Sequence, residues 1–383
     1  MKRSYIARRF QSSGAGLSLD TEALAKYKDI IDLSIGDTDF TTDESIINAA
    51  FRDAKAGHTH YGDPKGDPEL IDAVCRAWEE DFGQRLPRDH VLVSASSCLG
   101  MALVMLAILD PGDEVIVFSP YFPMYREQIE LAGGVCVDVP TYASEDYAID
   151  EARLRAAITP RTKAIVFNNP TNPTGMGYDR RTLELLARVA QEHDLLIAAD
   201  EIYTTYLYEG DFRPIRTLPG MAERTITLNS FSKNFLMTGW RVGVIIAEPE
   251  LLAVMNRING SLIYSAPSVS QRAAIQALAM RKEIREKYVT AYRDRIFYSA
   301  DRIEKLPYLS LVRPKGTFYL FPGVEKTGLD EKAFCKVLLD QAHVLVSPGT
   351  PFGVSAAGHF RIACTVGIDQ LKAAFDRMEK LSF

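Results

Sequence analysis

Cysteine is scarce in this sequence of 383 residues, and its few copies lack the spacing of a structural site. Five are present, widely scattered and without any C-x-x-C pair: Cys75, Cys98, Cys136, Cys335 and Cys364. An odd number of scattered cysteines argues against a disulfide scaffold or a zinc site, and it is typical of reduced thiols. We therefore predict a cytoplasmic protein without a metal site.

Long apolar runs and an excess of positive charge are also lacking. No uninterrupted apolar run approaches the length needed to cross a membrane, so no membrane partner is expected. The chain carries 44 Lys and Arg against 50 Asp and Glu, which gives a net charge of −6. Nucleic acid is bound by basic surfaces and is therefore not expected as a partner.

One basic cluster stands out, close to the N-terminus: Lys2, Arg3, Arg8 and Arg9. No apolar segment follows it that would make a signal peptide. We interpret the cluster as an arm that is solvated or docks on another subunit.

The rest of the chain has the composition of a globular protein with a large core, 47% hydrophobic and 25% charged. Short apolar runs alternate with helical patterns, and we predict strands at 91–93, 114–118, 135–139, 164–167, 195–199 and 225–228. This alternation predicts an α/β fold, with a mostly parallel sheet covered by helices on both faces. Mixed strands and helices towards the C-terminus, including a long charged helix at 269–303, predict a smaller α+β domain. We expect a large domain at 46–281 and a small domain built from both termini, 1–45 and 282–383.

Polar residues follow four of these strands. They are Ser94 to Cys98, Asn168 to Gly175, Asp200, and Ser230 to Lys233. Ligands of such sheets bind at the carboxyl ends of the strands. The four segments are therefore expected to meet in one pocket.

Lys233 is the centre of the most informative of these segments. A lysine acts as a nucleophile only as the free amine, so burial or a nearby cation must lower its pKa. Arg241 offers a planar fork of donors and Ser230 a hydroxyl, and together they suit a phosphate. A nucleophilic amine beside a phosphate site indicates an aldehyde cofactor that carries a phosphate. The alternative is a lysine between two strands, with Trp240 in the core.

The segment from Ser230 to Gly243 closely resembles the Schiff-base lysine motif of class I/II pyridoxal-phosphate aminotransferases. Further motifs match in family order from about residue 31 to residue 365. The resemblance implies an aminotransferase that moves an amino group between an L-amino acid and a 2-keto acid through a Schiff base of Lys233 with pyridoxal 5′-phosphate. It also implies a homodimer with shared active sites. A carbon–sulfur β-lyase on the same scaffold is the alternative.

Three polar residues are expected around the cofactor ring. A buried Asp200 needs a cation, and a protonated pyridine nitrogen would be that cation, although a cap of a following helix is the alternative. In the family, residues matching Tyr203 and Asn172 hydrogen-bond the phenolate oxygen of the cofactor. We predict Lys233, Asp200 and Tyr203 as the catalytic residues.

Other residues are expected at the faces and at the phosphate of the cofactor. Phe122 matches the aromatic that stacks on the ring, with Tyr121 as the alternative. Ser96, Ser97 and Cys98 begin a helix, where free N–H groups favour a phosphate. Tyr61 matches a tyrosine that reaches the cofactor phosphate of the other subunit.

The substrate side is predicted from two further segments. Gly36 lies in a turn that contacts the substrate carboxylate in the family, although Thr38 stands where Pro is common. Arg361 interrupts an apolar strand, and its fork suits an α-carboxylate. The alternative for Arg361 is an internal salt bridge.

The choice of amino donor is inferred from missing cations. One aspartate-specific branch of the family has an Arg at the position matched to Ser261 here, and another has a Lys at the position of Cys98. Because a second carboxylate must be buried against a cation, we expect a donor with a neutral side chain. The acceptor is expected to be 2-oxoglutarate, held by an arginine such as one of the N-terminal arm.

Overall fold

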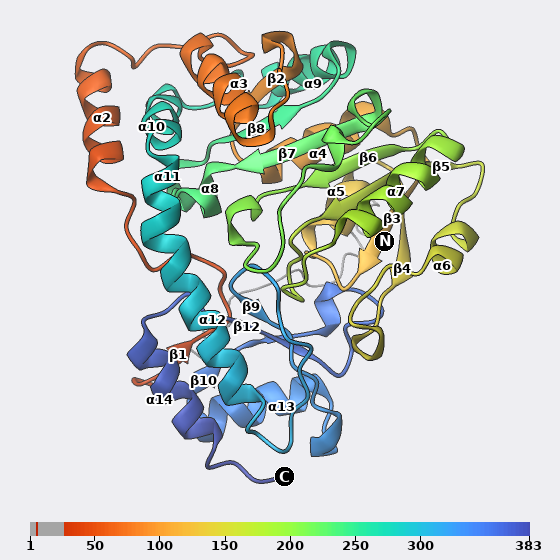
Figure 1. Ribbon diagram of the computed structural model, residues 1–383, viewed down its shortest axis with the longest axis vertical. Helices are drawn as coiled ribbons and strands as arrows, with labels where there is room; N and C mark the ends of the chain where they lie inside the picture. The colour runs from red at the N-terminus through yellow and green to blue at the C-terminus, as the bar shows by residue number, and fades with distance from the viewer. Residues whose placement is uncertain (1–4, 7–26) are drawn as a thin grey trace.

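The computed structural model describes residues 5–6 and 27–383 and contains one large sheet with a smaller region at one end (Figure 1). The basic cluster of Lys2, Arg3, Arg8 and Arg9 lies outside the described residues. Its expected roles therefore stay predictions.

The large sheet has seven strands. In spatial order they are β2 (Val91–Ser94), β8 (Gly243–Ile246), β7 (Thr225–Ser230), β6 (Leu196–Asp200), β5 (Thr162–Asn168), β3 (Glu114–Ser119) and β4 (Val135–Pro140). The five strands β7, β6, β5, β3 and β4 run parallel to one another. Only β8 runs the other way, antiparallel to both β2 and β7. The prediction of a mostly parallel α/β sheet is confirmed.

Four strands end on the polar residue that was predicted to come just after them. Ser94, Asn168, Asp200 and Ser230 are the last residues of β2, β5, β6 and β7. The ladder continues through them, since Asn168 pairs with Asp200 and Ser230 pairs with Gly243. Each polar side chain is thus fixed by a rigid strand rather than by a loop.

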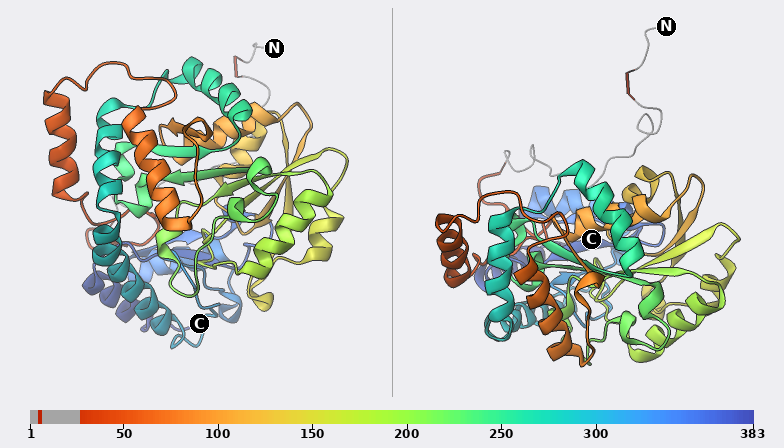
Figure 2. Two further views of the ribbon diagram at one scale, coloured as in Figure 1. Left: turned by 45° about the horizontal axis from the view of Figure 1, so that its top comes forward. Right: turned by 90° about the horizontal axis from the view of Figure 1, so that it is seen from above.

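Helices cover both faces of the sheet, as Figure 2 shows. Side chains alternate along a strand, so Val115 and Val117 of β3 face one hydrophobic cluster and Ile116 and Phe118 face another. The first face is covered by α4 (Ser97–Ile108), α5 (Met124–Leu131) and α9 (Pro249–Leu262). The opposite face is covered by α6 (Glu151–Ala156) and α7 (Arg180–Glu192) at one end and by α2 (Glu44–Lys55), α3 (Pro68–Phe82) and α10 (Ser268–Ala279) at the other.

The smaller region lies below the large sheet in Figure 1 and has its own hydrophobic cluster. Its sheets are β11 (Ser347–Pro348), β12 (Phe360–Ala363) and β9 (Tyr319–Leu320), which are antiparallel, and β1 (Ile31–Asp32) with β10 (Val344–Leu345), which are parallel. The helices of this region are α12 (Thr290–Ile303), α13 (Glu331–Val337) and α14 (Ile368–Met378). The domain limits at residues 46 and 281 stay a prediction.

The long helix predicted at 269–303 is divided. α10 ends at Ala279, and α11 (Arg281–Ile284) follows after Met280, whose backbone leaves helical geometry at φ −101°. A π-helical turn at Arg285–Val289 then leads into α12. No described helix combines the length and the apolarity that a membrane span requires.

Candidate active site

A cavity of about 330 Å³ lies at the carboxyl ends of β5 and β6, between the large sheet and the smaller region. Nine predicted residues line it: Gly36, Ser97, Cys98, Phe122, Asn172, Asp200, Tyr203, Lys233 and Arg361. Four others, Ser96, Ser230, Arg241 and Tyr61, are not part of its wall. The cavity thus joins residues from strand ends that lie far apart in the sequence.

Lys233 lies on α8 (Phe231–Asn234), the short helix after β7. Ser230 caps this helix by accepting a hydrogen bond from Ser232 N at 3.1 Å. Burial lowers the pKa of Lys233 to about 8, and the positive charges of Arg361 and Arg241 act in the same direction. On the order of a tenth of the side chain is therefore the free amine at pH 7, far more than for an unshifted lysine, and a nucleophile requires this form.

Gly36 contacts both Lys233 and Tyr319. The Lys233 Nζ donates a hydrogen bond to the Gly36 carbonyl. A Cβ atom at residue 36 would lie 1.8 Å from the Tyr319 hydroxyl. The absence of a side chain at Gly36 is therefore required by Tyr319, which the sequence did not reveal as a neighbour.

Asp200 is buried at the end of β6 without a cation. Its Oδ2 accepts a hydrogen bond from the Tyr125 hydroxyl at 2.5 Å, whereas Oδ1 has no partner among the described residues. Burial raises the pKa of Asp200 to about 6, although hydrogen bonds from Tyr125 and Ile202 N oppose the rise. No helix begins directly after Asp200, so the alternative of a helix cap is not supported. The unpaired oxygen calls for a donor from a ligand.

Arg361, on β12, is only 5% exposed and forms no ion pair with a carboxylate of the described residues. Its Nη1 donates to Asn172 Oδ1 at 3.1 Å and its Nη2 to the Ser34 carbonyl at 2.7 Å. Its Nε has no partner in the described part of the chain. The described residues thus offer no internal salt bridge to Arg361. A buried guanidinium without a counter-charge suits an anionic ligand.

Asn172 and Tyr203 are held by short hydrogen-bond chains. Asn168 accepts from Asn172 N at 2.8 Å and donates to the Asp200 carbonyl at 2.9 Å, which links the loop to β6. The hydroxyls of Tyr203 and Tyr319 lie 3.2 Å apart. Asn168, Asn172, Tyr203 and Tyr319 all line the cavity.

The helix α4 begins at the cavity. Ser96 caps it by accepting a hydrogen bond from Leu99 N at 3.3 Å, and Ser97 and Cys98 of the first turn line the cavity. Burial raises the pKa of the Cys98 thiol, while the charge of Arg241 opposes the rise. Gly243 lies against this turn, because a Cβ there would be 2.8 Å from Ser97 N.

Arg241 and Ser230 lie beside the cavity wall rather than on it. The exposed Arg241 has a left-handed backbone, φ +54°, and donates to the Thr238 carbonyl at 2.8 Å. The Ser230 hydroxyl already accepts from Ser232 N. Their role at a phosphate stays a prediction.

Tyr61 lies on the surface, away from the cavity of its own chain. Its side chain is 87% exposed and meets the ring of Tyr264 edge-on at 5.1 Å. An exposed tyrosine is consistent with a contact to a second subunit.

Sequence reasoning missed several residues of the cavity wall: Asp37, Tyr125, Gln128, Thr238 and Tyr319. Tyr125 lies in the first turn of α5 and Phe122 just before that helix, and both line the cavity. Of the two aromatics considered for ring stacking, Phe122 lines this cavity and Tyr121 does not.

The donor set fits pyridoxal phosphate. The unpaired Asp200 Oδ1 can accept from a protonated ring nitrogen, and the amine of Lys233 can react with an aldehyde. The first turn of α4 offers free N–H groups to a phosphate. No group of three or more His, Cys, Asp or Glu side chains that could hold a metal ion occurs within residues 5–6 and 27–383.

Comparison with known proteins agrees with this geometry. The family Aminotransferase class I and II matches residues 28–378. The aspartate/prephenate aminotransferase of Thermus thermophilus is 37% identical, with 98% of each chain covered. An arginine–pyruvate transaminase of Pseudomonas aeruginosa is 35% identical, covering 99% of this chain and 97% of that protein. A solved structure of a double mutant of the Thermus thermophilus aspartate aminotransferase has a TM-score of 0.94 at 35% identity. The match covers 99% of this chain and 100% of that one.

The chain belongs to the class I and II aminotransferase family. It is an enzyme that transfers amino groups between amino acids and keto acids and depends on pyridoxal phosphate. None of the three relatives named above is a lyase, so nothing in their names supports the β-lyase alternative.

Proposed function

We propose that Lys233 and Asp200 do the chemistry of amino transfer, with Arg361 orienting the substrate. The observation that carries this proposal is the pair of buried, unpaired atoms around one cavity, Asp200 Oδ1 and Arg361 Nε. When bound, pyridoxal phosphate supplies the aldehyde that takes up the amino group and a ring that withdraws electrons. Asp200 keeps the ring nitrogen protonated, and the amine of Lys233 takes the proton from the substrate α-carbon.

The remaining predicted residues hold the cofactor and substrate in place. Tyr203 and Asn172 hydrogen-bond the phenolate oxygen, and Phe122 covers the ring. The phosphate is bound by the start of α4 with Ser96, Ser97 and Cys98, together with Ser230 and Arg241. The substrate carboxylate meets Arg361 beside Gly36.

We also propose a homodimer in which Tyr61 completes the pocket of the other subunit. Large exposed apolar side chains support an interface near Tyr61: Tyr264 is 47% exposed, Leu262 54% and Ile263 40%. Mixing the inactive variants Lys233→Ala and Tyr61→Ala tests it. We expect activity to be restored in a fraction of the sites. If no activity returns after subunit exchange has been confirmed, the sites are not shared.

From the scattered free cysteines alone, we propose a cytoplasmic location.

The amino donor is proposed to have a neutral side chain, aromatic or aliphatic. The cavity wall includes Ile35, Met101 and Phe122, and Lys233 and Arg361 are the only cations of the described chain that line it. Both have assigned tasks, so no cation is left for a distal carboxylate. The relatives differ in the substrates that their names give, which leaves the donor to this argument.

A donor with a cationic side chain is the second candidate. Asp37 lines the cavity, and its carboxylate forms no ion pair with a described residue. Comparing kcat/KM for phenylalanine, methionine, alanine, arginine and aspartate, with 2-oxoglutarate as acceptor, decides between them. A preference for arginine that Asp37→Asn abolishes supports the second candidate. An aspartate value more than about tenfold above the others, about 1.4 kcal/mol of transition-state preference, contradicts both.

A further inference from the structure

The segment that carries Tyr61 has little structure of its own. Residues 56–66 join α2 to α3 without a helix or a strand, and nearly all of their side chains are exposed. Such a segment is mobile unless side chains from elsewhere hold it. A residue that must reach another subunit needs a fixed position, so the contacts that hold this segment matter for function.

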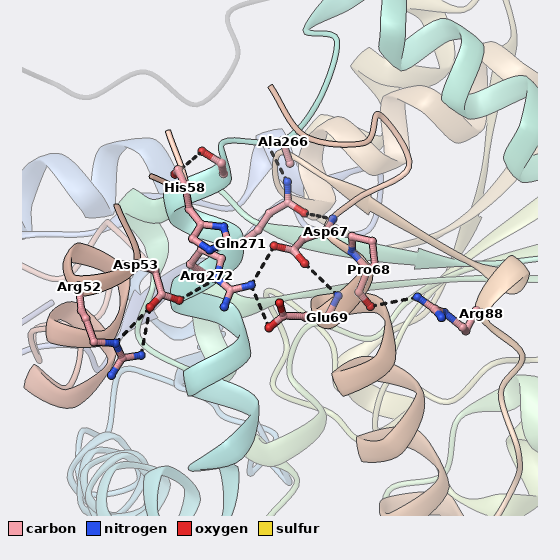
Figure 3. Close-up of polar contacts among 11 residues, drawn as sticks. Arg52, Asp53, His58, Asp67, Pro68, Glu69, Arg88, Ala266, Gln271 and Arg272 are labelled. Atoms are coloured by element: carbon pink, nitrogen blue, oxygen red, sulfur yellow. Dashed lines mark hydrogen bonds and ion pairs between the residues drawn. The ribbon is translucent and has the colours of Figure 1, made fainter. Parts of the chain in front are cut away.

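Arg272 of α10 ties the two ends of the segment together (Figure 3). Its Nε lies 2.7 Å from Asp53 Oδ2, in the last turn of α2. Its Nη1 lies 3.2 Å from Asp67 Oδ2 and 3.1 Å from Glu69 Oε2, at the start of α3. The Arg272 side chain is only 11% exposed, and the ion pairs with Asp53 and Asp67 are largely shielded from solvent, whereas the side chain of Glu69 is 66% exposed.

Two nearby residues of α10, Gln271 and Ser268, form three further hydrogen bonds around the segment. Gln271 Oε1 accepts from Asp67 N at 2.6 Å, and its Nε2 donates to the Ala266 carbonyl at 2.9 Å. Ser268 donates to the His58 carbonyl at 3.0 Å. Ala266 comes two residues after Tyr264, the residue whose ring meets Tyr61. The first turns of α10 therefore hold both aromatic residues in one arrangement.

Within the part of the chain that the structure describes, Arg272 is the only cation that forms ion pairs at both ends. Burial acts to raise the pKa of Asp53, but hydrogen bonds from Arg272 and Arg52 hold that pKa below its usual range. Asp53 thus stays charged near neutral pH. Without Arg272, the carboxylates of Asp67 and Glu69 would lie close together and lose the cation that pairs with both. Asp53 would also lose its link to α10.

We propose that Arg272 is a positioning residue for the active site of the other subunit. It fixes the segment 56–66, and thereby the place of Tyr61, without touching cofactor or substrate itself. The inference rests on the proposed homodimer with Tyr61 at the partner's cofactor phosphate. It predicts that loss of Arg272 damages the pocket across the interface and spares the pocket of its own chain.

Hybrid dimers purified through two different tags test this. One chain carries Lys233→Ala, so only the wild-type Lys233 of the other chain captures pyridoxal phosphate covalently, and its absorbance change reports one pocket. Arg272→Met is placed either on the Lys233→Ala chain, opposite the reporting pocket, or on the reporting chain. We expect the Kd for pyridoxal phosphate to rise about tenfold in the first arrangement and less than about twofold in the second. Pyridoxal without a phosphate should show no such difference.

Two controls separate positioning from general damage. Arg302→Met removes an arginine that is 13% exposed and also bridges acidic residues, Asp376 and Glu379, far from the segment, and it should leave both arrangements unchanged. Tyr61→Phe opposite the reporting pocket should weaken binding as Arg272→Met does. If Tyr61→Phe has no effect, the shared site itself fails, and the proposal fails with it.

If Tyr61→Phe weakens binding but Arg272→Met does not, Arg272 is not the positioning residue. Equal losses in both arrangements would mean a general structural role and would likewise overturn the proposal. Hydrogen exchange of the full-length protein gives a second readout, with faster exchange expected at 56–66 in Arg272→Met and not in Arg302→Met. Should Arg272→Met fail to fold, Arg272→Lys, which keeps the charge but loses the fork, is used in the same two arrangements.

Discussion

The two walls of the cavity are built from different parts of the chain and differ in their charge behaviour. The wall from the large sheet holds Asp200 and Lys233, whose pKa values are shifted by burial to about 6 and about 8. The wall from the smaller region holds Arg361, a permanent cation already hydrogen-bonded to Asn172 and Ser34. Groups that exchange protons near neutral pH thus lie on one side, and a fixed binding group lies on the other. Changes in the first wall should therefore affect kcat, and changes in the second should affect KM.

Lys233→Ala should give the largest effect. Without the amine, neither covalent capture of the cofactor nor proton transfer at the α-carbon can take place, and kcat should fall by about 10⁴-fold or more. Steady-state assays and the absorbance of cofactor bound to lysine measure both losses. A variant that still captures the cofactor covalently would remove Lys233 from its assigned role.

Asp200→Asn should come next. An amide does not hold the ring nitrogen protonated, so kcat should fall about 10²–10³-fold while the cofactor is still captured by Lys233. Turnover close to that of the wild type would show that Asp200 is a structural residue only.

The same substitution, Asp200→Asn, should also change how the stability of the cofactor-free protein depends on pH. Because the folded-state pKa of Asp200 is raised to about 6, the folded protein binds more protons than the unfolded chain between about pH 4 and pH 6. Stability therefore falls as pH rises through this window, by up to about 3 kcal/mol. Asp200→Asn should remove this fall, which thermal unfolding at pH 4 to 7 would show. An identical pH dependence in both proteins would contradict the assigned pKa.

Arg361→Lys tests the second wall. Lysine keeps the charge but lacks the planar fork, so the KM for the amino donor should rise about tenfold to a hundredfold with a smaller change in kcat. A loss confined to kcat would place Arg361 in the chemistry and would remove the contrast between the walls.

Tyr125→Phe should have the smallest effect. Asp200 Oδ2 would lose the hydrogen bond from the Tyr125 hydroxyl at 2.5 Å, which stabilises its charged form. The pKa of Asp200 in the variant should be higher, so the acidic limb of the kcat profile should move to higher pH. At neutral pH, kcat should fall about fivefold, which corresponds to about 1 kcal/mol. An unchanged profile would mean that the cofactor alone sets the charge of Asp200.

Among the predicted residues that line the cavity are some whose chemistry conflicts with their surroundings. Asp200 ends an apolar strand and Arg361 interrupts one, and a buried charge in such a place requires a reason. Lys233 was singled out by its own segment, which places a lysine near Ser230 and Arg241, and the strand-end rule placed that segment in the same pocket as the others. These arguments need only the strand pattern, and the predicted strands were correct to within a residue or two at most ends.

Other features could not be predicted because they depend on side-chain direction. Tyr125 lies in a helix with one buried face and Tyr319 in a short buried strand, and both patterns also fit core packing. The Ser230 hydroxyl caps α8, and the left-handed backbone at Arg241 determines where that side chain goes. Neither the cap nor the turn follows from the order of residues alone.

The contact between Gly243 and the start of α4 limits how this enzyme can vary. A single added methyl group at residue 243 would lie 2.8 Å from Ser97 N and 2.9 Å from the Asn229 carbonyl, so the backbone on one side would have to shift. Gly243 does not line the cavity. Even so, a lineage that replaced it with alanine would lose cofactor affinity while keeping every reactive group. The tolerance of the active site to mutation is therefore limited by a residue that has no side chain.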